Sequence, residues 1–89
     1  MKASWEGVLR EVGRHQTTTI RRVAEATGLT PAAARNVVLA LERRGLVERL
    51  AWTYDPDSGF KRWAIGASDQ GRRELRRRRL RRRAVRLAA

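Results

Sequence analysis

The densest group of chemically active side chains is a run of ten arginines within residues 72–86. A guanidinium group is planar and carries five N–H donors, so it pairs bidentately with a phosphate or with a guanine edge. Residues 72–89 hold ten basic and one acidic residue, a net charge of +9, whereas residues 1–71 hold eleven and eight, a net charge of +3. This field attracts polyanions, and the arginine bias favours nucleic acid, although GC-rich coding would also produce it. The ten are Arg72, Arg73, Arg76, Arg77, Arg78, Arg79, Arg81, Arg82, Arg83 and Arg86.

Other side-chain chemistry is scarce. The chain has no cysteine and one histidine, which excludes disulfide bonds, zinc-finger spacings and thiolate nucleophiles. Its nine acidic residues are scattered, and the sequence contains no glycine-rich phosphate loop and no nucleophile–base pair. His15 lies in a polar segment, where we expect a solvated turn residue. The sequence therefore predicts a binding protein and not an enzyme, with no metal and no cofactor.

Three short helices are predicted in the first half of the chain. The first is indicated by apolar residues that recur at i, i+3, i+4 and i+7. Ser4 is its expected cap, and Gly13 is its expected end. The second begins after a Thr19 cap and ends near Gly28. The third covers residues 30–44, since a threonine followed by a proline is a strong helix start. The apolar residues expected on the inner faces are Trp5, Val8, Leu9, Val12, Ile20, Val23, Ala24, Ala34, Val37, Val38 and Leu41.

A β-hairpin is predicted over residues 46–67, where β-branched and aromatic residues flank the turn-forming segment 55–59. Its four-residue loop fixes a register in which large apolar side chains share one face, packed on the helices. We expect all three tryptophans to fill a core that is otherwise small. The pairs expected on the helices are Leu50 with Ile65 and Trp52 with Trp63. The face expected in solvent carries Arg49, Ala51, Thr53, Arg62 and Ala64.

A last helix is predicted to begin after a Ser68 cap. We assign residues 1–71 to one domain and residues 72–89 to an arginine-rich C-terminal helix or tail. Arginines four residues apart repel each other, so this tail should fray when free and become firm on an anionic partner. A thin apolar stripe through which two tails could pair, although arginines surround it, consists of Leu80, Ala84 and Leu87.

The order helix, helix, turn, helix, two-stranded wing, helix resembles the winged helix-turn-helix regulators of the MarR, ArsR and PadR sort. The resemblance covers about residues 5–75. It implies a mainly α fold with a small β-hairpin wing, which is a winged helix-turn-helix domain (α+β). The residues that carry it are Val23 and Ala24 followed by Gly28, Leu29 and Thr30, then the run LERRGLV at 41–47, and SDQGR at 68–72, which is similar to the family's Thr-x-x-Gly step into its next helix.

The resemblance also implies a DNA-binding transcriptional regulator. Residues 30–44 would be the recognition helix in the major groove, residues 46–67 would be the wing that flanks it, and the arginine tail would contact phosphates. The helix carries few polar side chains that could bond to bases, which indicates low sequence specificity, readout of DNA shape, or a face used partly for protein contact. The residues that would read bases are Arg35 and Asn36, through hydrogen bonds, and Ala32 and Ala33, through methyl contacts. The expected phosphate and wing contacts are Thr17, Thr18, Thr30, Arg49, Lys61 and Arg62.

We expect double-stranded DNA as the partner, the cytoplasm as the location, and a homodimer as one option. Asp55 and Asp57 at the wing tip would repel DNA, so the strands and not the tip should make contact. The alternative is a winged-helix module for protein interaction whose basic tail binds RNA, which is the less favoured partner. Membrane binding is not expected, because the longest apolar run, residues 37–41, is too short to span a bilayer and the tail lacks bulky apolar residues opposite its charges.

Overall fold

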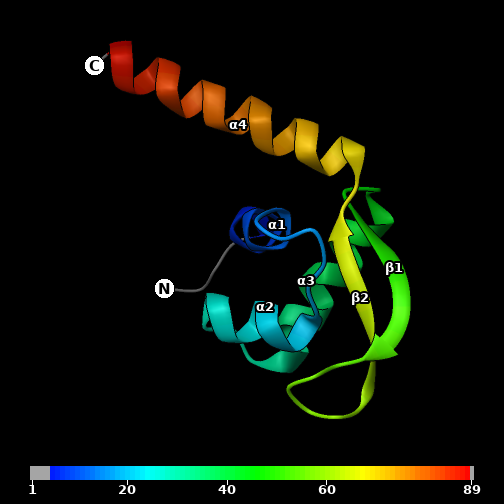
Figure 1. The fold of residues 1–89 in the computed structure, drawn as a ribbon. Coiled ribbons are helices and arrows are strands. Elements are labelled where there is room, and N and C mark those ends of the chain that lie inside the picture. The colour runs from blue at the N-terminus through cyan, green and yellow to red at the C-terminus, as the bar shows by residue number, and fades with distance from the viewer. Residues whose placement is uncertain (1–4, 89) are drawn as a thin grey trace.

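The computed structural model describes residues 5–88 as four helices and a two-stranded antiparallel sheet (Figure 1). The predicted fold class, mainly α with a small β-hairpin, is confirmed. Ser4, the predicted cap of the first helix, lies outside the described residues, and within them no helix is long and apolar enough to cross a membrane. The elements in chain order are α1 (Trp5–Gly13), α2 (Ile20–Thr27), α3 (Pro31–Arg43), β1 (Val47–Tyr54), β2 (Lys61–Ala67) and α4 (Asp69–Ala88).

The ends of α2 and α3 are set by the local signals that predicted them. The Thr19 hydroxyl accepts a hydrogen bond from a backbone N–H three residues on (3.3 Å), which caps α2. Gly28 ends that helix with φ +74°, a left-handed conformation that glycine adopts without steric cost. The Thr30 hydroxyl accepts from the Ala33 N–H (3.2 Å), and Pro31 occupies the first position of α3.

Helices α1, α2 and α3 pack around one core, and the hairpin closes its open side (Figure 1). The predicted apolar positions Val8, Leu9 and Val12 of α1 are fully buried. Ile65 of β2 joins this core and forms a two-way backbone bridge with Thr18 (2.9 and 2.8 Å), so the segment before α2 is tied to the hairpin. The remaining core residues are Val23, Val38, Leu41, Leu46, Val47 and Ala67.

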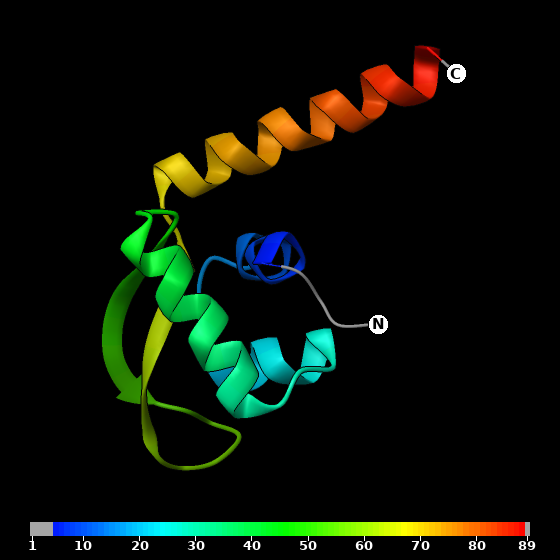
Figure 2. The same ribbon diagram turned by 180° about the vertical axis from the view of Figure 1, so that it is seen from behind.

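Helix α4 leaves the hairpin at Ser68 and crosses the molecule beside α1 (Figures 1 and 2). The Ser68 hydroxyl donates to the Gly45 carbonyl oxygen (2.5 Å) and accepts from the Gly71 N–H (3.0 Å). Gly71 is packed so closely on the strand entry that a Cβ there would lie 2.0 Å from the Leu46 carbonyl oxygen. Leu75 packs on the core from the next turn. These contacts fix the direction in which α4 starts.

The rest of α4 continues without a break to Ala88, and its C-terminal turns extend past the body of the molecule (Figures 1 and 2). The tail that was expected to fray is therefore helical in this structure. The division into a domain of residues 1–71 and a tail of residues 72–89 stays a prediction.

The hairpin departs from the predicted packing. Trp52 and Trp63 pair as expected, but a β-bulge interrupts β1 at Leu50, so Arg49 pairs with Ile65 in its place. Leu50, Trp52 and Trp63 are 45%, 53% and 41% exposed, and the prediction that they lie in the core was wrong. The reason is the reach of the hairpin. Ile65 is covered by the helices, whereas the tryptophan pair lies two residues, roughly 7 Å, further toward the tip, where helical cover ends.

Candidate nucleic-acid interface

The outer face of α3 is built from small side chains with two polar groups among them. Arg35 and Asn36 are both exposed in the first two turns, where a helix docked by its N-terminal end would meet a ligand. Within residues 5–88, Arg35 has no carboxylate partner, so its guanidinium donors are free. Ala32 is exposed and Ala33 is half-buried, which leaves room for close approach of another surface.

The three threonines predicted to contact phosphate differ in exposure. Thr17 is exposed, and Thr30 is exposed while its hydroxyl caps α3. Thr18 is 4% exposed because its backbone is held against Ile65 of β2. A phosphate outside the protein cannot reach a side chain buried in this way, so we leave Thr18 out of the proposed contacts.

The cations of the hairpin are held by local partners. The Arg49 Nε donates to a Glu42 carboxylate oxygen (3.0 Å), and its guanidinium lies 5.4 Å from the centre of the Trp63 ring. The Lys61 ammonium lies 5.4 Å from the Tyr54 ring centre. The three residues predicted for the wing, Arg49, Lys61 and Arg62, keep partly or fully exposed side chains, so each can still contact an anion.

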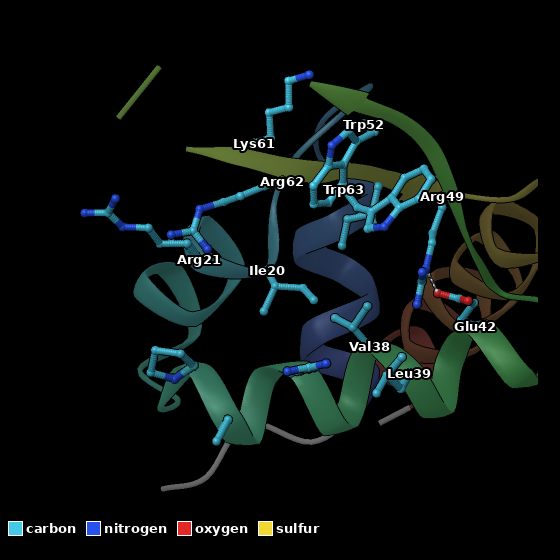
Figure 3. A pocket seen from close by; sticks show the side chains of 14 residues that line it. Ile20, Arg21, Val38, Leu39, Glu42, Arg49, Trp52, Lys61, Arg62 and Trp63 are labelled. Carbon is cyan, nitrogen blue, oxygen red and sulfur yellow. Dashed lines mark hydrogen bonds and ion pairs between the residues drawn. The ribbon is translucent and has the colours of Figure 1, made fainter. Parts of the chain in front are cut away.

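An open groove of about 580 Å³ separates α3 from the hairpin (Figure 3). Trp52 and Trp63 line the hairpin side of the groove. Their rings are in edge-to-face contact, with 5.5 Å between the ring centres. Val38 and Leu39 of α3 lie across the groove from them. The cations at its edges are Arg21, Arg35, Arg49, Lys61 and Arg62. An apolar floor with cationic edges suits a ligand that carries both flat apolar surface and negative charge.

Sequence reasoning missed this aromatic groove because alternation shows which side chains share a face, and not how far the covering helices reach. The one available signal is length. Strand β1 has eight residues, which is roughly 26 Å of hairpin, and helices of eight to thirteen residues cross it without covering it to the tip.

The acidic tip of the hairpin is neutralised within the molecule. Asp55 is 1% exposed and accepts hydrogen bonds from the Asp57 N–H (3.0 Å) and the Ser58 hydroxyl (3.2 Å), with the Arg62 Nε at 3.3 Å. The Asp57 backbone bond, helped by Ser58 and Arg62, lowers the pKa of the Asp55 carboxyl. Asp57 pairs with Arg22 of α2 (2.9 Å), and this hydrogen bond raises the pKa of the Arg22 guanidinium. The tip is thereby tied to the helix-turn-helix.

Replacing Asp55 with asparagine is expected to loosen the hairpin tip. The Asp57 N–H bonds to Oδ1 of this carboxylate, whereas the Ser58 hydroxyl and Arg62 use Oδ2. An amide offers one acceptor oxygen in place of two and no charge, so one of these two sides loses its acceptor. Protection of the backbone amides of residues 57–60 against hydrogen exchange should fall, while that of α3 stays unchanged. The matched control is Asp69→Asn, which removes an exposed carboxylate outside the hairpin.

The same carboxylate predicts an acid dependence. Because the folded-state pKa of Asp55 is lowered, its stabilising contribution is present above the ordinary carboxyl pKa and is lost as the pH falls through the lowered value. Protection at residues 57–60, corrected for intrinsic exchange, should therefore fall in acid in the natural chain and change little in the asparagine variant. Equal acid sensitivity of the two proteins would contradict this assignment.

The arginines of α4 fall into two sets. Glu74 holds Arg77 (2.9 Å) and Arg78 (3.0 Å), and the Arg77 hydrogen bond is the largest cause that lowers the pKa of the Glu74 carboxyl. Glu6 of α1 holds Arg78 (3.2 Å) and also Arg82. Arg78 and Arg82 attach α4 to α1, whereas Arg77 is paired within α4 alone. The exposed arginines without an ion pair in the described residues are Arg72, Arg73, Arg76, Arg79, Arg81, Arg83 and Arg86.

Three helices followed by an antiparallel hairpin, with α2 and α3 joined by a three-residue turn, define a winged helix-turn-helix domain whose wing is the hairpin. A model of the MarR family matches residues 1–51, which is more than half of the chain. This chain belongs to the MarR family.

Solved structures agree on the fold. The PcaV transcriptional regulator from Streptomyces coelicolor, in complex with its natural ligand, is 29% identical with a TM-score of 0.69 and covers 98% of this chain and 62% of its own. FabT from Streptococcus pneumoniae, in complex with DNA, is 17% identical with a TM-score of 0.73, covering 91% and 54%. MarR from Staphylococcus aureus, in complex with salicylate and kanamycin, is 17% identical with a TM-score of 0.80, covering 99% and 56%.

This chain spans less than two thirds of the length of these relatives. No curated protein matches the sequence.

Proposed function

We propose that this protein is a transcriptional regulator that binds double-stranded DNA through α3 and the hairpin. The observation that carries the proposal is the outer face of α3, where Arg35 and Asn36 stand exposed among small side chains at the capped N-terminal end of the helix. Membership of the MarR family and the likeness to FabT, which was solved with DNA, support it. Nothing in this role requires a catalytic group, and we propose none.

In this proposal α3 enters the major groove. Arg35 can pair bidentately with guanine and Asn36 with adenine, and the Ala32 and Ala33 methyl groups can contact thymine. The hairpin then lies over the flanking backbone, where Arg49, Lys61 and Arg62 meet phosphates. Thr17 and Thr30 contact phosphates of the DNA backbone beside α3.

Only two polar side chains on α3 are proposed to hydrogen-bond to bases, which predicts a short and degenerate recognition sequence. A single pair of bidentate contacts specifies about two base pairs, so further specificity must come from DNA shape or from a second copy of the protein. A homodimer would present two α3 helices to half-sites about one helical turn apart. We place this regulator in the cytoplasm, where it would meet its DNA.

Selection of bound duplexes from a random pool tests the proposal. We expect the enriched duplexes to share a guanine and an adenine at fixed positions, the bases proposed for Arg35 and Asn36. If the protein binds as a dimer, the enriched sequence should be a palindrome. A competition at equal salt with structured RNA distinguishes the alternative class of RNA-binding module. Selection without any enrichment, together with preference for RNA, would contradict the proposal.

The salt dependence of DNA binding is expected to be steep. If α4 neutralises about six phosphates, log K should fall with log salt at a slope near −5 on that account alone. Removing residues 76–89 deletes eight arginines and should make the slope clearly shallower on a duplex of unrelated sequence, which α4 can bind without a selected site on α3. Fluorescence anisotropy over a series of salt concentrations measures both slopes, and equal slopes would show that α4 does not contact DNA.

A further inference from the structure

The geometry points to a second DNA-binding surface on α4 and the adjoining side of α1, and we propose that it holds a different duplex from the one on α3. A single chain would then bridge two DNA segments. The inference rests on the proposed function only for the first of these duplexes. The second follows from the arrangement of arginines on α4.

Five arginines form a continuous row along α4, which we call the arginine stripe: Arg72, Arg76, Arg79, Arg83 and Arg86. Their spacing of i, i+4, i+7, i+11 and i+14 places them on one side of a helix. They span 14 residues, roughly 21 Å along the axis. All five are exposed, and within residues 5–88 none has a carboxylate partner.

The stripe is free because other residues anchor the helix. Glu6 pairs with Arg78 and Arg82, and the Arg78 guanidinium lies 4.3 Å from the centre of the Trp5 ring. These contacts join the start of α1 to the middle of α4 across more than 70 positions of sequence. The anchoring arginines lie on a different side of α4 from the stripe, so docking of the helix leaves the stripe available.

The stripe borders a cationic hollow of about 270 Å³ between α1 and α4. Arg10 and Arg14 line it from α1, and Arg79 and Arg82 line it from α4, with Leu75 between them. Glu6 and Glu11 hold some of these groups, yet four guanidinium groups face two carboxylates there. A hollow with excess positive charge suits a phosphate group.

This surface lies on the far side of α1 from the helix-turn-helix. Figure 2 shows α4 at one end of the molecule and the tip of the hairpin at the other, with α1 between α4 and α2, while only the C-terminal end of α3 comes close to the start of α4. Helix α4 contacts α1 and β2, and it runs away from the hairpin from its first turn (Figure 1). A straight duplex held along α3 and the hairpin therefore does not pass along the stripe, and phosphates bound there belong to another segment.

The composition of the stripe favours nucleic acid over other partners. Cores of protein–protein interfaces are depleted in charged residues, whereas the stripe contains five like charges and no apolar residue. A helix that lies on a membrane needs a bulky apolar face opposite its charges, but the exposed Leu80 and Leu87 lie beside the stripe and Arg77 and Arg81 lie opposite. Bidentate pairing with successive phosphates fits a row of guanidinium groups.

A capture assay with two duplexes tests the inference. One duplex, chosen by the selection above, is fixed to beads, and a second, fluorescent duplex of unrelated sequence is captured only when the full-length chain binds both. Replacing Arg76, Arg79 and Arg83 with glutamine should lower capture at least tenfold and leave binding to the selected duplex within about threefold. The matched control replaces Arg73, Arg77 and Arg81 with glutamine, which removes the same charge from another side of α4 and should keep most of the capture.

The outcomes separate the two proposals. Binding of the selected duplex without capture of a second one overturns the second surface and leaves the α3 interface standing, whereas absence of any binding to duplex DNA overturns both. Equal loss of capture in both triple variants shows a general charge effect and no stripe. Sedimentation of each variant gives its mass and therefore its oligomeric state. If the stripe variant loses capture because it no longer forms a dimer, the inference is also overturned. Displacement of the second duplex by phosphatidylglycerol vesicles or polyglutamate at equal negative charge assigns the stripe to a membrane or an acidic protein.

Discussion

Replacing both Arg35 and Asn36 with alanine should remove the sequence preference of DNA binding while leaving general affinity for DNA largely intact. Each bidentate contact to a base edge contributes about 1–3 kcal/mol of discrimination, so the two together account for roughly 30-fold to 10⁴-fold preference for the selected duplex over a scrambled one. The remaining cations of the hairpin and of α4 still bind phosphates, which carry affinity and no sequence information.

Competition between a selected and a scrambled duplex, followed by anisotropy at fixed salt, measures this ratio. Arg43→Ala is the matched control, because Arg43 is also exposed on α3 but lies in its last turn. That variant should weaken binding to both duplexes alike. A double variant that keeps its preference would show that another element reads the sequence, with the groove tryptophans Trp52 and Trp63 as the first candidates.

The helices could be predicted from sequence because their signals are local. Thr19, Gly28 and Thr30 act on backbone groups within three residues, and a threonine–proline pair defines the start of α3 without reference to the rest of the fold. The same holds for the register at Trp52 and Trp63, which follows from the length of the loop between the strands.

The tertiary surroundings of these residues could not be predicted in the same way. Burial of Thr18 depends on its bridge to Ile65, 47 positions away, and exposure of the tryptophan pair depends on where the helices stop. The bulge at Leu50 moves one side chain out of register and leaves no trace in the alternation of the strand.

For the candidate site, residue types were predictable but their partners were not. Arg49 was expected on the solvent face, but the bulge at Leu50 sets it opposite Ile65, where Glu42 of α3 and the Trp63 ring hold it. Arg62 is held by Asp55. The run of arginines in residues 72–86 was evident as charge, and the division into anchoring arginines and a free stripe becomes visible only once Glu6 and Trp5 are placed against α4. Ion pairs between residues far apart in the sequence determine which arginines remain free to bind a ligand. These pairs cannot be predicted from a single sequence.

The other large effect is expected at Gly71, which decides whether α4 can dock. A Cβ at this position would lie 2.0 Å from the Leu46 carbonyl oxygen and 3.0 Å from its carbonyl carbon, and backbone cannot move aside as a side chain can. The Leu46 oxygen also accepts from the Ser68 N–H (3.0 Å), so any shift that relieves the clash strains the entry into α4.

Gly71→Ala should therefore destabilise the fold by about 2 kcal/mol, since overpacking costs about 1–3 kcal/mol and a lost hydrogen bond about 1, offset by roughly 1 from the helix propensity of alanine. For a chain of this size the melting temperature should fall by about 8–16 °C. Gly13→Ala is the matched control. Its Cβ would meet only the Leu75 Cδ1 atom at 2.5 Å, the end of a side chain that can rotate away, so its effect should stay within about 1 kcal/mol. Thermal unfolding followed by circular dichroism compares the two. Equal melting temperatures would mean that α4 tolerates a shift at its first turn, and the fixed placement of the arginine stripe on the far side of α1 would then lose its structural basis.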